Sequence, residues 1–478
     1  MARWRMWAWA LILPLCGGAL GGCGPAPASL WGPGERALPL PAGLRVAFNH
    51  REGQRYRSPV GGQWRQGDDL EAMVVEAIRE ARHEILVAVQ ELSLAGVAEA
   101  LNERHRQGVA VRVVLENTYS TPWSTQHPAD LTPHQRHRFA QLQALGQPDA
   151  VALLLGAGVP LIDDTADGSA GSGLMHHKFL VVDRRVVVTG SANFSPSCVH
   201  GDPDDPRTRG NVNHLLRFES PALAEVFAEE FGRMWGDGPG GAPDSRFGLA
   251  KESGPAQTVW VGNTPVEVLF APHRRSDPNH GLHWLAERLA VAHRRLDLSL
   301  FVFSAQGLAD TLAALSPRGV TIRLLADPGF ASRPFSEVLD VLGVSRADGD
   351  CLLEADNKVW QKPLEGVGTP RLAGGDKLHH KFAVIDGVQV ITGSFHWSPS
   401  AAHQNDETLL LIDSPQLAAH FTREMDRLWR GAELGVTGRM ERGLARSHQR
   451  CGRGQARPSE RRTAHRPLPS MATSAAAP

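Results

Sequence analysis

The sequence predicts an α/β protein built from two similar halves. Apolar segments with the character of strands alternate with amphipathic segments that have helical spacing, and the whole series occurs twice. The stretch LMHHKFLVVDRRVVVTGSANFS at residues 174–195 returns in altered form as KLHHKFAVIDGVQVITGSFHWS at residues 377–398. A repeat of this kind indicates a duplicated structural unit, so both halves are expected to share one fold.

Each element of the first half follows from its local pattern. Asp68 is a candidate N-cap for a helix over residues 68–82, and Gly108 is a candidate end for a helix over residues 96–108. A further helix is expected over residues 219–235, where a Ser-Pro pair precedes an amphipathic run. Strands are expected where apolar residues dominate, at residues 44–49, 84–92 and 109–117.

The second half repeats this order. Its expected strands lie at residues 266–272, 296–304 and 320–329, and its expected helices at residues 280–295, 306–319 and 413–429. A Gly- and Pro-rich segment after residue 236 has the composition of a linker. The sequence therefore predicts halves at residues 44–236 and 263–431, joined by a linker at residues 237–262.

The N-terminus has the pattern of a targeting segment. Arg3 and Arg5 precede an apolar run that is too short to span a bilayer. The sequence LGGC at residues 20–23 resembles a bacterial lipobox, so we expect residues 1–23 to be a signal peptide with Cys23 as the lipid anchor. A plain cleaved signal or a retained anchor is the alternative. In either case we expect an exported protein, either a membrane-anchored lipoprotein or a periplasmic or extracellular protein.

The charge is distributed unevenly along the chain. Residues 435–478 contain nine Arg and two Glu, or about +7, whereas the remainder has 41 basic and 49 acidic residues, or about −8. An acidic body is poorly suited to non-specific nucleic-acid binding, which needs clustered Lys and Arg. The tail shows no apolar periodicity, so we expect a disordered basic segment, either simply solvated or weakly attracted to anionic surfaces.

The cysteines fit an exported protein without establishing one. Once the targeting segment is set aside, Cys198, Cys351 and Cys451 remain, and none has the spacing of a zinc site. A disulfide between Cys198 and Cys351 is one possibility. Three free thiols are the other.

The repeated stretch carries a recognisable motif. In each copy a His-x-Lys is followed after four residues by Asp, and six residues later by Gly-Ser; the residues are His176, Lys178, Asp183, His379, Lys381 and Asp386. This pattern resembles the signature of the phospholipase D superfamily over residues 44–430. The resemblance implies two α/β halves, each a mixed sheet flanked by helices, packed about a pseudo-twofold axis with the active site between them. One chain would then be active as a monomer.

The resemblance also implies a chemical role for each motif residue. His176 would attack phosphorus and form a phosphohistidine, while His379 would protonate the leaving group as general acid. Lys178 and Lys381 would bind the nonbridging phosphate oxygens, so neither a metal nor another cofactor is expected. Supporting contacts to phosphate are expected from Ser191, Asn193 and Ser394. Asp183 and Asp386 mostly hold local structure in the superfamily.

Three further positions are asymmetric between the halves. Glu407 resembles the superfamily's acid that orients a histidine ring, but its counterpart in the first half is Asn213. An amide cannot stabilise an imidazolium as a carboxylate does, which predicts a nucleophile less basic than its partner. His396 stands where the first copy has an asparagine, and it either replaces that amide's hydrogen bonds or adds a third histidine to the site. His177 and His380 are expected to point away from the site and to pack.

The substrate is not specified by the motif. A lipid anchor and a polar insertion at residues 117–137, with Tyr119 and Trp123, favour a phospholipid at a membrane. The expected function is therefore hydrolysis of phospholipid head-group phosphodiesters. The alternatives are an exported nuclease, a phosphatidyltransferase such as a cardiolipin synthase, and a catalytically inactive binding module, which the two intact motifs disfavour.

Overall fold

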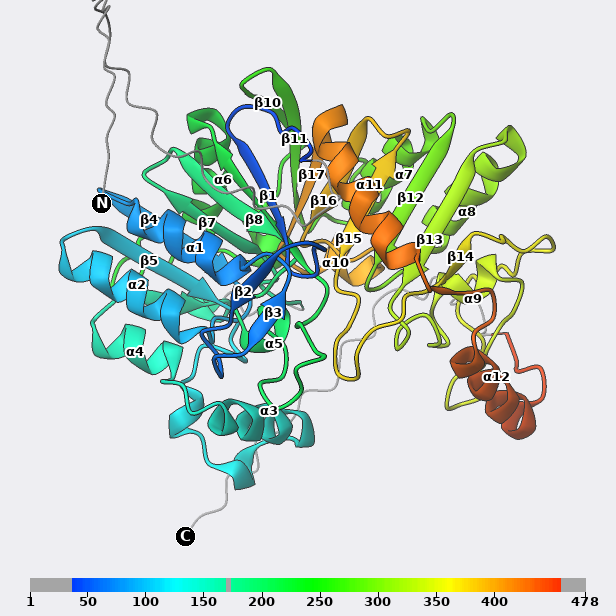
Figure 1. The fold of residues 1–478 in the computed structure, drawn as a ribbon, viewed down its shortest axis with the longest axis horizontal. Helices are drawn as coiled ribbons and strands as arrows, with labels where there is room; N and C mark the ends of the chain where they lie inside the picture. The colour runs from blue at the N-terminus through cyan, green and yellow to red at the C-terminus, as the bar shows by residue number, and fades with distance from the viewer. Residues whose placement is uncertain (1–36, 169–172, 457–478) are drawn as a thin grey trace, which may run out of the picture.

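A computed structural model describes residues 37–168 and 173–456 of this chain (Figure 1). The predicted signal peptide with Cys23, and the end of the tail from residue 457, lie outside the described residues. The predicted fold class is confirmed, because two mixed sheets flanked by helices occupy the two halves of the chain. Among the described helices, none combines the length and apolarity that a membrane span requires.

In the part of the first half that the structure describes, seven strands form one sheet. Its order is β1 (Leu44–Phe48), β9 (His214–Glu219), β8 (Val186–Gly190), β7 (Lys178–Val182), β4 (Glu84–Val89), β5 (Ala110–Leu115) and β6 (Leu161–Asp163). The pairs β4–β5 and β5–β6 are parallel, and the others are antiparallel. The motif strand β7 therefore lies at the centre of the sheet.

The second sheet repeats this order and adds a strand at each edge. It runs β10 (Gln257–Val261), β11 (Thr264–Ala271), β17 (Glu407–Asp413), β16 (Gln389–Gly393), β15 (Lys381–Ile385), β12 (Arg295–Leu300), β13 (Thr321–Ala326), β14 (Val367–Thr369) and β18 (Glu433–Leu434). The predicted linker boundary at residue 262 is wrong, because β10 already pairs with β11 as a hairpin. The strand pattern in QTVWV covers only five residues, which is too short to distinguish a strand from a linker by sequence.

The helices cover both sheets and join them. Outer helices of the first half are α1 (Leu70–Arg79), α2 (Ala95–Arg106) and α4 (Ala150–Gly156), and those of the second are α7 (Gly281–Ala290), α8 (Gln306–Leu315), α9 (Glu337–Val341) and α10 (Pro399–His403). The inner helices are α6 (Pro221–Trp235) and α11 (Pro415–Trp429). One apolar cluster contains α6, α11 and strands of both sheets, so the two halves share a central core. Asp69, rather than the predicted Asp68, caps α1.

Shorter elements lie outside the two main sheets and their helices. The strands β2 (Arg55–Arg57) and β3 (Trp64–Gln66) form a hairpin, and α5 (Pro196–Val199) follows the first motif. The predicted insertion at residues 117–137 contains 3-10 turns at Trp123–Thr125 and Pro128–Asp130 and leads into α3 (Pro133–Ala144), which hangs below the body in Figure 1. Further 3-10 turns lie at Ala166–Gly168, Gly248–Lys251 and Ser316–Arg318.

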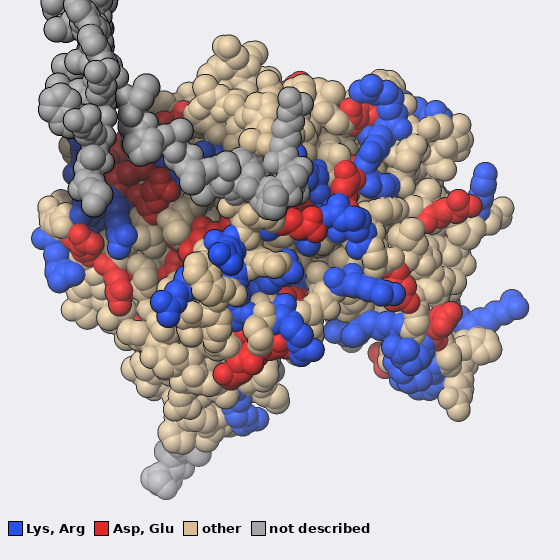
Figure 2. Space-filling model, in the orientation of Figure 1, with Lys and Arg blue, Asp and Glu red and all other residues tan. Residues whose placement is uncertain are grey.

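The basic tail is partly folded, which corrects the expectation of disorder. Residues Gly438–Cys451 form α12, whose Met440, Gly443 and Ser447 are buried against the second half. Of these three residues only Met440 is large and apolar, so the segment is too hydrophilic overall for its helical pattern to stand out from a solvated tail. Lys and Arg side chains gather over α12, whereas charges of both signs are mixed over the rest of the visible face (Figure 2).

A disulfide fastens α12 to the body. It joins Cys351 to Cys451, while Cys198 is buried with a free thiol, so neither possibility considered from the sequence, a Cys198–Cys351 disulfide or three free thiols, is correct. Cys351 lies in the second half, and Cys198 in the first half hydrogen-bonds locally to Asn211. The Ser447 hydroxyl also donates to the Ala347 carbonyl oxygen, at 3.0 Å.

We expect Cys451→Ser to lower the free energy of unfolding by about 2–4 kcal/mol, because the bond closes a long loop in the unfolded chain. The two cysteines are 100 residues apart. Urea unfolding should show the loss, and trypsin should cut α12 more quickly. Dithiothreitol should destabilise the wild type and leave Cys451→Ser unchanged. Equal effects of dithiothreitol on both proteins would contradict the prediction.

Candidate active site

The two motifs meet at the boundary between the halves. Met175 forms an isolated parallel bridge with Asp406, and Leu378 forms the equivalent bridge with Val212. Each bridge places the histidine that follows it beside the other half: the His176 amide donates to the Asp406 carbonyl, and the His379 amide donates to that of Val212. The histidines therefore immediately precede β7 and β15, which begin at the motif lysines.

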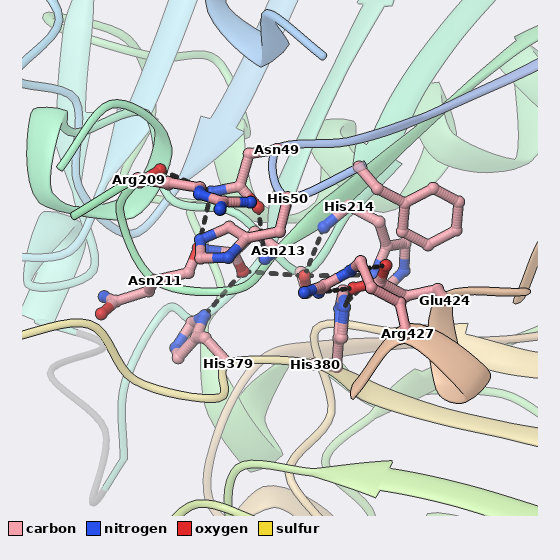
Figure 3. Close-up of polar contacts among 12 residues, drawn as sticks. Asn49, His50, Arg209, Asn211, Asn213, His214, His379, His380, Glu424 and Arg427 are labelled. Carbon is pink, nitrogen blue, oxygen red and sulfur yellow. Dashed lines mark hydrogen bonds and ion pairs between the residues drawn. The ribbon is translucent and has the colours of Figure 1, made fainter. Parts of the chain in front are cut away.

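The side chains that orient the two histidines cross between the halves. Nδ1 of His176 lies 2.9 Å from Oε2 of Glu407. Nδ1 of His379 lies 2.9 Å from Oδ1 of Asn213, as Figure 3 shows. The predicted nucleophile thus has the carboxylate, and the predicted general acid has the amide. The expectation of a less basic nucleophile is reversed, because it took each orienting residue to serve its own half.

The hydrogen bonds around Asn213 fix the tautomer of His379. The Asn213 amide nitrogen donates to the backbone carbonyls of Cys198 and Asn211, so its oxygen is the atom that faces the ring. That oxygen can only accept, which places a proton on Nδ1 of His379. The Glu407 carboxylate imposes the same arrangement on His176. Both rings therefore carry a lone pair on Nε2 when they are neutral, and in His379 this atom lies 3.2 Å from the Lys381 ammonium.

The motif serines support the orienting residues. Ser191 Oγ donates to Oδ1 of Asn213 at 2.8 Å, and Ser394 Oγ donates to Oε2 of Glu407 at 2.6 Å. Both hydroxyls are buried. They also accept from the backbone amides of His214 and Thr408. Their hydroxyl donors are therefore directed at Asn213 and Glu407.

The motif lysines are buried beside the histidines. Lys178 Nζ donates to the His176 carbonyl at 2.8 Å, and Lys381 Nζ donates to the His379 carbonyl at 2.7 Å. Burial lowers the pKa of Lys178 to about 8, partly offset by Glu407. Burial and then the neighbouring Lys178 lower the pKa of Lys381 well below its usual value. Two buried ammonium groups are costly in an apolar interior, and an anion between them removes that cost.

The same environment keeps the histidines neutral. Burial, followed by the charges of Lys178 and Lys381, lowers the pKa of His176 well below 6.5. Burial, followed by Lys381 and His396, lowers that of His379. Burial raises the pKa of Glu407 to about 7. A neutral imidazole is the nucleophilic form, so the site is suited to attack on phosphorus.

His396 brings a third ring to the site. Its centroid lies 5.0 Å from that of His176, 5.9 Å from that of His379 and 5.3 Å from that of Phe301. Within the described part of the chain, its Nδ1 is buried without a hydrogen-bond partner. Asn193, the equivalent residue in the first half, donates to Gln90 Oε1 at 3.1 Å. His396 therefore does not reproduce the bond of the amide it replaces.

The motif aspartates lie away from this centre. Asp183 follows the far end of β7, roughly 16 Å along the strand from Lys178. Its carboxylate accepts from the backbone amides of Arg82, His83 and Glu84. Asp386 accepts in the same way from His293, Arg294 and Arg295. Asp183 therefore holds the start of β4 and Asp386 that of β12, through backbone amides distant from His176 and His379.

The neighbouring histidines His177 and His380 are buried in a second layer, as predicted. Nε2 of His177 lies 3.1 Å from Glu230, and Nε2 of His380 lies 3.0 Å from Glu424. The other ring nitrogen of His177 faces Thr408 in the opposite half. The other ring nitrogen of His380 faces His214 in the same way (Figure 3). Sequence reasoning missed Glu230 and Glu424, although they occupy the same place in the two matched helices α6 and α11.

Duplicated α/β halves with opposed His-x-Lys motifs at their boundary define the phospholipase D class of proteins. This chain belongs to that family: the family model described as "Cardiolipin synthase, PLD-like domain" matches residues 74–235 and 285–429.

Curated relatives match part of the chain. The mitochondrial cardiolipin hydrolase of Xenopus laevis is 31% identical over 145 residues, which is 30% of this chain and 59% of that protein. This chain therefore spans little more than half the length of that relative. The mitochondrial cardiolipin hydrolase of Danio rerio is 27% identical over 197 residues, covering 39% of this chain and 78% of that protein.

Among solved structures, the phosphatidylserine synthase of Haemophilus influenzae Rd KW20 has a TM-score of 0.51 and 14% identity. The match covers 83% of this chain and 88% of that one. At this identity the likeness shows a common fold for both halves together.

Proposed function

We propose that this protein is a phosphodiesterase that hydrolyses phospholipid head-group phosphodiesters through a phosphohistidine. The observation that carries the proposal is the crossed pairing of His176 with Glu407 and of His379 with Asn213, which leaves two Nε2 atoms for chemistry beside two buried lysines. The names of the cardiolipin hydrolases and of the phosphatidylserine synthase support a lipid as substrate.

In the first step, Nε2 of His176 attacks phosphorus and the bond to the head-group oxygen breaks. That oxygen takes a proton from Nε2 of His379, which reacts in its protonated imidazolium form, so a neutral alcohol leaves and His379 becomes neutral. The imidazole that now carries phosphorus gains positive charge, which the Glu407 carboxylate stabilises through Nδ1–H. Lys178 and Lys381 face the negative charge on the nonbridging oxygens.

In the second step, water attacks phosphorus while Nε2 of the now neutral His379 takes its proton. The P–N bond breaks, and His176 and a phosphomonoester are released. Asn213 suits this exchange, because an amide does not hold a proton on the ring as a carboxylate would, and His379 can both give and take one.

The substrate is tested by head-group release from vesicles of phosphatidylcholine, phosphatidylglycerol and cardiolipin, in EDTA and with ethanol as a competing acceptor. We expect phosphatidate together with phosphatidylethanol, and no requirement for added metal, because the lysines supply the positive charge. Intact vesicles alongside degraded single-stranded DNA would replace the lipid assignment with the nuclease. Transfer to lipid alcohols without hydrolysis would indicate a phosphatidyltransferase.

The site predicts an acidic pH preference. A general acid acts only while protonated, and His176 needs the ionised Glu407 carboxylate. Burial and the neighbouring Lys381 lower the pKa of His379 below 6.5, whereas burial raises the pKa of Glu407 to about 7, so the fraction with both required forms, and with it kcat/KM, falls above about pH 7. A p-nitrophenyl ester, whose leaving group needs no proton, should lose this limb in the pH–rate profile. Identical limbs above about pH 7 for alkyl and p-nitrophenyl esters would contradict the assignment.

We also propose that the protein is exported and tethered by Cys23. The Cys351–Cys451 disulfide supports an oxidising compartment. Labelled palmitate should enter the wild type, and Cys23→Ala should abolish labelling and release the protein from membranes, whereas Cys16→Ala should do neither. A wild type that is unlabelled and soluble from the outset would exclude the tether.

A further inference from the structure

The two sides of the active site have opposite character. Gln90 and Phe301 occupy equivalent positions, since their amides donate to the carbonyls of His177 and His380 respectively. In the first half Gln90 hydrogen-bonds Asn193, whereas in the second half Phe301 packs against His396. The duplicated fold thus places a polar pair on one side and an aromatic pair on the other.

The aromatic side continues outward from the catalytic centre. The ring of Phe301 lies 4.8 Å from His379 and 4.5 Å from Phe330, and Phe330 lies 6.4 Å from Phe335. Phe301 and Phe330 are half-buried, and Phe335 is 43% exposed. We call Phe301, Phe330 and Phe335 the aromatic strip. It leads from the reacting atoms to the protein surface.

Charged groups frame the strip without interrupting it. The guanidinium of Arg333 lies over the face of Phe330, 6.0 Å from its centroid, and the Lys381 ammonium lies over Phe301 at 5.6 Å. Phe335, at the outer end of the strip, also lines a cavity of about 570 Å³ together with Arg333, Glu337 and Glu354. Because carboxyl groups line this cavity, an apolar chain on the strip is expected to end at the exposed ring of Phe335.

The equivalent path in the first half is polar. Tyr119 stands where the second half has Phe330, three residues beyond the acid that follows the matched strand. Arg138 covers the Tyr119 ring at 4.9 Å and pairs with Glu91 at 3.0 Å. Glu91, Arg138 and Asp376 line a cavity of about 240 Å³ on that side. Within residues 37–168 and 173–456, the continuous aromatic surface beside the catalytic histidines lies in the second half.

We infer that the aromatic strip binds an acyl chain of a lipid phosphodiester, with the phosphate held between His176 and His379. This inference rests on the proposed function. It specifies in addition that the acyl chain of the substrate lies on the second-half side of the active site. Continuity with the catalytic histidines identifies the occupant as part of the substrate, and the apolar character of the strip identifies that part as the hydrocarbon chain.

The test uses p-nitrophenyl alkyl phosphodiesters with methyl, butyl, hexyl and octyl arms. In the wild type, kcat/KM should rise between about twofold and fourfold per added CH2, because the strip covers one side of the chain. In Phe335→Ser the octyl-to-methyl ratio of kcat/KM should fall at least about tenfold, while Phe335→Leu should keep most of it. Trp260→Ser, at an exposed aromatic residue on β10, serves as the matched control and should keep the wild-type ratio.

Each enzyme's methyl ester rate is its internal reference, so a lower yield of folded protein cancels in the ratio. A flat ratio in the wild type, or an unchanged ratio in Phe335→Ser, overturns the inference. If vesicle head groups are released while the ratio is flat, the strip assignment alone fails. If vesicles remain intact and single-stranded DNA is degraded, the proposed function fails and the acyl chain with it.

Discussion

His176→Ala and His379→Ala should each lower kcat at least about a thousandfold on lipid head-group esters, or about 4 kcal/mol of barrier. His176→Ala removes the nucleophile, so no covalent intermediate can form. His379→Ala removes the proton donor and the base that activates water, so it slows both steps. The measurement is the initial rate of head-group release, with folding checked by circular dichroism.

The two variants should differ on a substrate with a good leaving group. With a p-nitrophenyl ester, His379→Ala should still form the phosphohistidine and then stall, giving a burst of nitrophenolate and an acid-labile, base-stable phosphoprotein. His176→Ala should give neither. His283→Ala, at an exposed histidine on α7, is the control and should keep wild-type activity. A burst from His176→Ala would show that the roles are exchanged.

Glu407→Gln should lower kcat by between about 10² and 10⁴. The change preserves the shape of the side chain but removes the charge that stabilises His176 once it carries phosphorus. The change also creates a conflict of donors. In the wild type, Nδ2 of Asn405 donates to Oε1 of Glu407. If the amide oxygen of the new glutamine faces His176 and Ser394, its nitrogen takes the place of Oε1 and two donors face each other. The buried network can no longer be fully satisfied.

The loss in Glu407→Gln should fall on kcat more than on KM, because the charge matters most when the intermediate forms. Single-turnover kinetics with the p-nitrophenyl ester should show a slower burst of unchanged amplitude. Glu287→Gln, on the exposed surface of α7, provides the matched control. An equally small effect of both substitutions would mean that His176 works with an amide partner, as His379 does.

Much of the fold could be read from local pattern. The predicted strands and helices of both halves appear as β4, α2, β12 and α8 within a few residues of their expected bounds, because the apolar period of a strand or helix is set by its own residues. The same holds for the motif residues His176, Lys178, His379 and Lys381. The spacing of these residues occurs twice in the sequence, and the structure brings both copies together at the boundary between the halves.

Two features, helix α12 and the Cys351–Cys451 disulfide, were not predicted. The buried face of α12 is formed by Met440, Gly443 and Ser447, which give a helix too little apolar character to be recognised. The disulfide partner of Cys351 could not be identified from the sequence either, because cysteine spacing does not determine which thiols approach each other. Both depend on α12 docking against a loop from the middle of the second half.

The sequence by itself determined the two halves, their elements and the residues able to react. Only the tertiary structure decided that Glu407 serves His176, that Asn213 serves His379 and that Ser191 and Ser394 hold these partners. It also placed Phe330 next to Phe301 and Phe335 next to Phe330. The physical reason is that these contacts join residues from different strands and loops, in several cases from different halves. Local periodicity fixes the face of each element, but the packing of the elements fixes which faces meet.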